Sequence, residues 1–220
     1  MFYFRINRIK VSDNKDKKSF LGILGKDLAE VKLLSFISNE SVQLPDVSNY
    51  VSETDETKKN ALLSGMISTI VANRILTTAD NIKDNSYITF GDTGYTLYQA
   101  NTIPEYFDWQ FLVLESDKHA RDTAAMVQNI LAHKDFTSFA GSLATLLKTA
   151  GNPAYAASVQ IIKFAAKTIT DLVKKDKDDM IGLLYMSLNK AEHYPDGKRN
   201  SVNVPDLTGN IMIDYSIFSG

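Results

Sequence analysis

The sequence contains no cysteine and no long uninterrupted apolar run. Without cysteine there is no disulfide framework, no thiolate metal site and no cysteine nucleophile, so stability must come from burial of apolar surface. No run of about 18 uncharged apolar residues occurs, so we expect no transmembrane segment. Residues 1–12 interrupt every apolar run with a charge, which is typical of neither a secretory signal nor an anchor. We therefore expect a cytoplasmic protein, or one exported without a cleavable signal peptide.

An excess of charge of one sign is also missing. Lys and Arg total 24 and Asp and Glu total 26, for a formal net charge of −2. The strong positive field that holds a nucleic-acid backbone is absent, so we expect no nucleic-acid partner. Hydrophobic residues make up 44% of the 220 residues, which is enough to build a substantial core.

Alternating apolar residues predict strands at both ends of the chain and in its middle. Residues 2–11 alternate and then change phase near residues 7–8, which predicts a bent strand with a bulge. A second strand is expected over 28–38, again with a change of phase. Further strands are predicted at 87–90, 95–100, 109–114, 180–188 and 209–218. The strand at 109–114 is apolar on both faces, so we place it centrally.

Two stretches repeat apolar residues at the three- and four-residue steps of an amphipathic helix. The stretch near 54–76 predicts one helix, because Thr54-Asp55-Glu56-Thr57 is a start signal. The stretch near 117–175 predicts about three helices, since Asp135 can cap one and Asn152-Pro153 can open another. We interpret both apolar stripes as core-packing faces.

The predicted fold class is α+β, an antiparallel β-sandwich with helical insertions. Strands from both ends of the chain must pair with the middle ones, which favours a single domain over residues 1–220. The sandwich would comprise 1–50, 85–116 and 179–220, with insertions near 54–76 and 117–175. The alternative is two domains split near residue 118, which would leave the last two strands far from any partner.

One short motif suggests catalysis but has a simpler interpretation. Residues 91–94 contain the Asp-Thr-Gly triplet of aspartic proteases, which need two such carboxylates to share a proton. Only one copy is present. Between two predicted strands, the segment is expected to form a hairpin turn.

Acidic residues gather where the chain leaves the strand at 109–114. Glu115, Asp117 and Asp122 are hard oxygen ligands of the kind that calcium prefers. The alternative is structural: Asp117 caps the helix that follows, and Asp122 lies on its exposed face.

Two segments resemble the calcium- and lipid-binding C2 domains of protein kinase C and synaptotagmin. Residues 25–33 are similar to that family's Gly-x-Ser-Asp-Pro-Tyr-Val-Lys-Val stretch, and residues 109–122 resemble its later strand. The resemblance implies a C2-like Greek-key sandwich in which Asp27 matches the first-loop aspartate. Glu115, Asp117 and Asp122 match the third-loop set, so calcium is the one cofactor that the resemblance implies, with peripheral contact to a lipid surface.

A long loop is expected over 192–208, and its residues His193, Tyr194 and Asp196 are candidate binding residues. Loops between buried strands often display sites. The favoured function is a non-catalytic interaction module that binds a protein partner, with no catalytic residues assigned. Two alternatives stay open. One is a bacterial effector or toxin component, or its neutralising partner, and the other is a hydrolase that uses His193 with Asp196 or Asp206.

Overall fold

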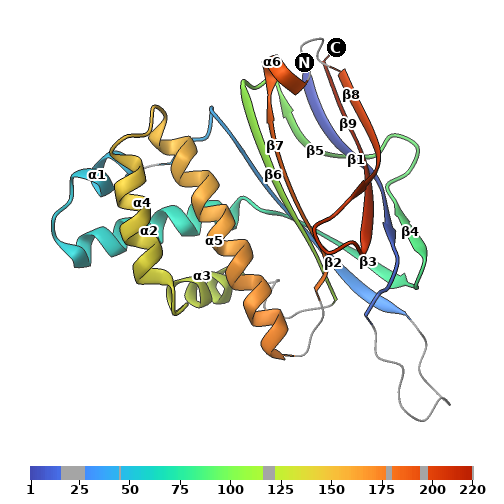
Figure 1. Ribbon diagram of the computed structural model, residues 1–220, viewed down its shortest axis with the longest axis horizontal. Coiled ribbons are helices and arrows are strands. Elements are labelled where there is room, and N and C mark those ends of the chain that lie inside the picture. The colour runs from blue at the N-terminus through green and yellow to red at the C-terminus, as the bar shows by residue number, and fades with distance from the viewer. Residues whose placement is uncertain (16–27, 45, 116–121, 177–179, 194–197, 220) are drawn as a thin grey trace.

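The computed structural model describes residues 1–15, 28–44, 46–115, 122–176, 180–193 and 198–219. These residues form an α+β fold of two antiparallel sheets and a layer of helices (Figure 1). Sheet A contains β1 (Phe2–Val11), β4 (Ser86–Thr89), β5 (Tyr95–Ala100), β8 (Lys198–Pro205) and β9 (Ile211–Ser219). Sheet B contains β2 (Ala29–Asn39), β3 (Ile75–Ile82), β6 (Tyr106–Glu115) and β7 (Met180–Asn189). The helices are α1 (Val47–Ser52), α2 (Glu56–Ala72), α3 (Thr123–Leu131), α4 (Phe136–Leu147), α5 (Pro153–Asp176) and α6 (Lys190–His193).

Strands from the two ends of the chain lie side by side in sheet A. The order there is β4-β1-β9-β8, with β5 also paired to β1, and sheet B has the order β3-β2-β6-β7. β1 pairs with β9 along its whole length, and β7 pairs with the central strand β6. β1 also pairs with β4 and β5, so the expectation that strands from both chain ends pair with middle strands is confirmed for β1 and β7, whereas β9 pairs with β1 and β8.

The bulge predicted in the first strand is confirmed. The change of phase expected in the second strand, however, does not come from a bulge against β6. The register of β1 against β9 shifts between Ile6 and Arg8. In contrast, the register of β2 against β6 runs without interruption from Val31 to Asn39. Its two apolar series belong to two buried faces, one against sheet A and one against the helices. When a strand is buried on both faces, apolar residues occupy both alternating series, and the sequence looks as if the alternation had changed phase.

An aromatic cluster fills the space between the two sheets. Phe4 packs edge-on against Phe107, Trp109 and Tyr215, with ring centroids 5.0, 4.9 and 5.8 Å away. The Trp109 indole N–H donates to the Ser35 hydroxyl at 2.9 Å, so the buried polar atom of this ring is satisfied. The two sheets thus share one core, in the arrangement of a β-sandwich.

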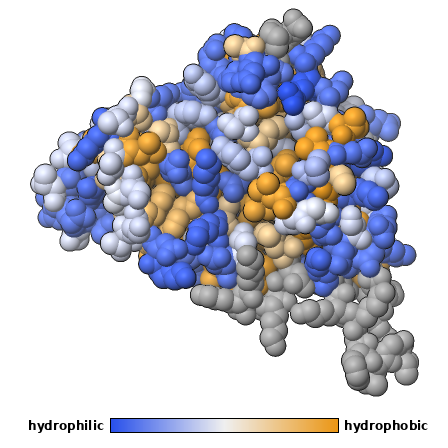
Figure 2. All heavy atoms as spheres, viewed as in Figure 1, coloured by the Kyte–Doolittle hydropathy of each residue, from blue (hydrophilic) through white to orange (hydrophobic). Residues whose placement is uncertain are grey.

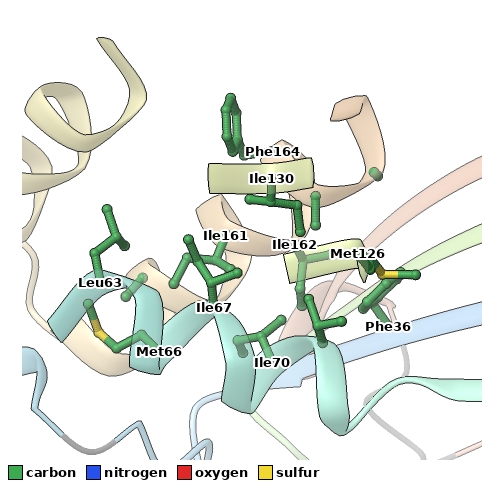
Figure 3. Packing of buried hydrophobic residues seen from close by; sticks show 14 of the residues in the cluster. Phe36, Leu63, Met66, Ile67, Ile70, Met126, Ile130, Ile161, Ile162 and Phe164 are labelled. Carbon is green, nitrogen blue, oxygen red and sulfur yellow. The ribbon is translucent and has the colours of Figure 1, made fainter. Parts of the chain in front are cut away.

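The helices cover the outer face of sheet B and share a second core with it (Figures 1 and 3). Figure 3 shows Ile67 and Ile70 of α2 facing Ile161 and Ile162 of α5, with Phe36 of β2 close by. In the helical stretch near 117–175, Leu143, Ile162 and Ile169 are buried and Phe139 is half-buried, so the apolar stripe faces the core as expected. None of the helices in the described part of the chain combines the length and hydrophobicity that a membrane span requires.

The structure corrects several predicted elements. The helix expected near 54–76 ends at Ala72, and Ile75 begins strand β3, which the sequence analysis did not predict. The loop expected at 192–208 contains β8, and the short helices α1 and α6 were also missed. Residues 91–94 do not form a hairpin turn, because β4 and β5 both pair with β1, one after the other, instead of with each other.

Gly94 lies between β4 and β5, at the point where the chain passes the bulge of β1. Its φ is +73°, and a Cβ atom would lie 2.7 Å from Asn7 Oδ1 and 2.9 Å from the Ile6 carbonyl oxygen. We expect Gly94→Ala to lower the free energy of unfolding by about 2 kcal/mol or more, from backbone strain and this clash together.

Gly91→Ala is the matched control. Its φ of +67° imposes similar strain, but a Cβ atom there has no neighbour within 4 Å, so only about 1 kcal/mol should be lost. Urea unfolding of both variants measures the difference. Equal losses of unfolding free energy in the two variants would show that the close approach of Gly94 to β1 does not disfavour a side chain at this position.

Candidate functional site

The predicted calcium ligands are only partly within the described residues. Asp27 and Asp117 lie outside them, and Glu115 is the last residue of β6. Asp122 is the N-cap of α3, where its Oδ1 accepts the backbone N–H groups of Ala124 and Ala125 at 2.8 and 3.2 Å. Among the described residues, no group of three or more acidic or histidine side chains is placed to hold a metal ion. Asp122 therefore has a structural role, and calcium binding stays a prediction.

The two roles of Asp122 can be separated by one substitution. We expect Asp122→Ala to cost about 1 kcal/mol of unfolding free energy, the usual loss when a helix cap is removed. The loss should be the same in millimolar calcium and in chelator, because the capping bonds need no ion. A larger loss in calcium would mean that the carboxylate also binds the metal.

Of the predicted binding residues in the loop, only His193 lies within the described residues. Tyr194 and Asp196 lie outside the described residues, while His193 ends α6 and its Nδ1 accepts the Asn189 backbone N–H at 3.1 Å. Asp206, the other partner considered for a histidine, accepts hydrogen bonds from the backbone N–H groups of Leu183, Thr208, Asn210 and Ile211. Through these hydrogen bonds, Asp206 holds the turn between β8 and β9 against β7.

A buried carboxylate that the sequence analysis missed joins three elements. Asp108 of β6 is only 5% exposed and accepts hydrogen bonds from the hydroxyls of Tyr155 on α5 and Tyr185 on β7, the latter at 2.7 Å. Burial, followed by the bond to Asp108, raises the pKa of Tyr185 to about 12 and raises that of Tyr155 as well. Both tyrosines are therefore neutral donors near pH 7 and are not general bases. The Asp108 cluster (Asp108, Tyr155, Tyr185) fastens α5 to sheet B.

A second charged cluster connects the turn between α3 and α4 to α5. His133 Nε2 lies 3.2 Å from Asp171, and the Lys167 ammonium lies 2.8 Å from Asp135 and 2.9 Å from Asp171. The hydrogen bonds from Lys167 lower the pKa of both carboxyl groups. Asp135 is the N-cap residue of α4, as expected, but its side chain makes no capping bond and instead pairs with Lys167. The cluster is a contact between helices.

The outer face of sheet A presents a different set of side chains. Since Phe2, Phe4 and Ile6 of β1 point into the core, the alternate residues point outward. The register places Tyr3 opposite Phe218 of β9. The outer face so defined contains Tyr3, Arg5, Arg8, Lys10, Tyr87, Thr96, Lys198, Met212, Asp214, Ser216 and Phe218.

Arginine side chains stack on aromatic rings along this face. The Tyr3 and Phe218 rings stack at 5.1 Å, and the Arg5 guanidinium carbon lies 4.7 Å from the centroid of Phe218 and 5.3 Å from that of Tyr3. The Arg8 guanidinium lies 4.6 Å from the centroid of Tyr87 and also pairs with Asp214 at 2.7 Å. Stacking of this kind holds each guanidinium in a defined orientation.

Helices α1 to α5 all lie on the sheet B side of the molecule, so they leave the outer face of sheet A uncovered (Figure 1). In the space-filling view, hydrophobic side chains gather in the middle and in a band that runs over the strands toward the upper right, while the right-hand margin, on the sheet A side, is mostly hydrophilic (Figure 2). The outer face therefore combines exposed polar groups with a few aromatic rings and is not a broad apolar patch.

The sequence alone predicts only part of the outer face of sheet A. The alternation in residues 2–11 marks Tyr3 and Arg5 as outward, but it cannot show that Phe218 lies opposite Tyr3 from the other end of the chain. Asp108 was missed because the predicted strand began one residue later, at Trp109. Comparisons of the chain with protein-family models, with curated proteins and with solved structures found no match, so no family is assigned to it.

Proposed function

We propose that the chain is a non-catalytic interaction module that binds a protein partner on the outer face of sheet A. The observation that carries the proposal is the stack of Arg5 on Tyr3 and Phe218, on a sheet face that none of the described helices covers. Arginine and aromatic residues are enriched at the centres of protein interfaces, and the two rings already hold the Arg5 side chain in place before a partner binds.

Finer expectations belong to the same proposal. A C2-like Greek-key arrangement would add a calcium site and contact with a lipid surface, and a bacterial effector or its neutralising partner would be one kind of interaction module. Residence in the cytoplasm, or export without a cleavable signal, also remains a prediction. These expectations support the proposal only through the sequence resemblance and composition described above.

Selection from a library of random peptides tests the proposed surface. The full chain would carry a photo-reactive benzoylphenylalanine in place of Tyr87, which is 48% exposed on the outer face. A matched variant would carry it in place of Leu146, which is 39% exposed on α4. We expect selected peptides to crosslink from position 87 and not from position 146. Failure to select any peptide, or crosslinking only from position 146, would overturn the proposal.

A further inference from the structure

We infer that the outer face of sheet A selects an acidic, extended segment of its partner through Arg5 and Lys10. This inference rests on the proposed function of the same face, and it adds the chemistry of the partner. It is argued from charge complementarity and from the spacing of the two cations along β1.

The cations of this face are only partly neutralised by the chain's own carboxylates. Asp214 pairs with Arg8, whereas in the described part of the chain no carboxylate forms an ion pair with Arg5, Lys10 or Lys198. The whole chain has a formal net charge of −2. A local excess of positive charge on an otherwise slightly acidic molecule attracts a complementary acidic surface and disfavours a basic one.

The position of the Arg5 guanidinium suits a carboxylate. Its Nε donates to Thr96 Oγ1 at 3.1 Å and one terminal nitrogen donates to the Thr93 carbonyl oxygen at 3.3 Å. The other terminal nitrogen has no hydrogen-bond acceptor among the described residues. Because the two rings and these bonds already fix the group, a partner carboxylate can accept from it with little further loss of side-chain entropy.

The spacing indicates the length of the segment. Arg5 and Lys10 both point outward on β1 and lie five residues apart, with the bulge between them. The bulge adds one residue to β1, so the facing residues of β9, Ser216 and Met212, are four residues apart, which at about 3.4 Å per residue corresponds to about 14 Å along the strand. A partner segment of about five extended residues with carboxylates near both ends would reach the two cations.

Basic and aromatic sheet faces can also bind single-stranded nucleic acid, where bases stack on free ring faces. Here the Tyr3 and Phe218 rings stack on each other and carry the Arg5 guanidinium. Their faces are therefore already covered to a large extent, which favours recognition by charge over recognition by base stacking.

Fluorescence anisotropy with synthetic probes tests the inference on the full chain. The probes are a fluorescein-labelled peptide Glu-Glu-Tyr-Glu-Glu-Tyr-Glu, the same peptide with glutamine in place of glutamate, and a labelled oligothymidine. We expect the acidic peptide to bind at least about tenfold more tightly than the glutamine peptide, and its binding to weaken with added salt. The oligothymidine should bind more weakly than the acidic peptide.

Charge-reversal variants then locate the binding. Arg5→Glu and Lys10→Glu should each weaken binding of the acidic peptide by about fivefold or more. The Lys10 side chain makes no hydrogen bond or ion pair in the described part of the chain, so its variant is expected to fold normally. Lys134→Glu, at an exposed position between α3 and α4, is the matched control and should change the dissociation constant less than about twofold.

The outcomes separate the inference from the proposed function. Equal binding of the acidic and glutamine peptides, both weakened by Phe218→Ala, would overturn the acidic selectivity and leave the proposed protein-binding face in place. No binding of either peptide would overturn the inference alone, because the library selection decides the proposed function. Tighter binding of oligothymidine, lost in Arg5→Glu, would overturn both.

Discussion

Replacing Leu143 by aspartate is expected to unfold the protein or bring it close to unfolding. Leu143 is 2% exposed in the core that the helices share with sheet B. The substitution removes a buried apolar side chain and places a carboxylate among apolar neighbours, at a combined cost of about 4–7 kcal/mol. Domains are typically stable by about 5–15 kcal/mol, so most of that stability would be lost. Thermal melting followed by circular dichroism measures the change.

The same helix provides the control. Leu146 is 39% exposed, so Leu146→Asp introduces the same charge on α4 without burying it. Its cost should be about 1 kcal/mol at most, part of it from the unfavourable charge near the helix C-terminus. If the two variants melted at the same temperature, the inward position of Leu143 would be wrong.

The second large effect is expected at Asp108. Asp108→Ala removes the acceptor of two tyrosine hydroxyls and leaves both in a partly buried site. Hydrogen bonds to a charged group contribute about 1.5–3 kcal/mol each, and the tyrosines can regain part of this from water, so we expect a loss of about 3 kcal/mol. Denaturant unfolding at neutral pH is the appropriate measurement.

A double-mutant cycle shows whether the loss comes from the cluster itself. Tyr185→Phe should cost about 2 kcal/mol in the wild-type background and clearly less in the Asp108→Ala background. Tyr106→Phe is the control, because Tyr106 is 52% exposed and stacks on Tyr155, and its hydroxyl makes no hydrogen bond to any described residue. Strict additivity of Asp108→Ala and Tyr185→Phe would show that the two groups do not interact.

The local sequence pattern was sufficient to predict elements whose buried residues follow a regular spacing within one strand or helix. The bulge of β1 could be predicted because the change of phase lies within one strand. Strand β3 was missed because Ile75 continues the apolar spacing of the preceding helix, and the remaining residues of this edge strand are mostly exposed. β8 was missed for a similar reason, since its sequence is polar and it lies at the edge of sheet A.

The candidate site depends on contacts that local pattern does not contain. Tyr3 and Phe218 meet only because β1 and β9 are neighbours, and Asp108 meets Tyr155 only because α5 lies across sheet B. Of the residues proposed for calcium or loop binding, Glu115, Asp122 and His193 are described; Glu115 ends β6, and the other two have local structural roles. The chemistry of single residues could be predicted from the sequence, but their assembly required the strand order.

The pairing of β1 with β9 also constrains the order of folding. β1 is synthesised long before β9, so sheet A cannot be completed until the intervening residues 12–210 have been synthesised. The aromatic residues of β1 that fill the core must stay exposed or be held by other contacts until then. Pairings of such long sequence separation slow folding and lengthen the period in which a chain can aggregate. We therefore expect synthesis of this protein to depend more on chaperones than its final stability would suggest.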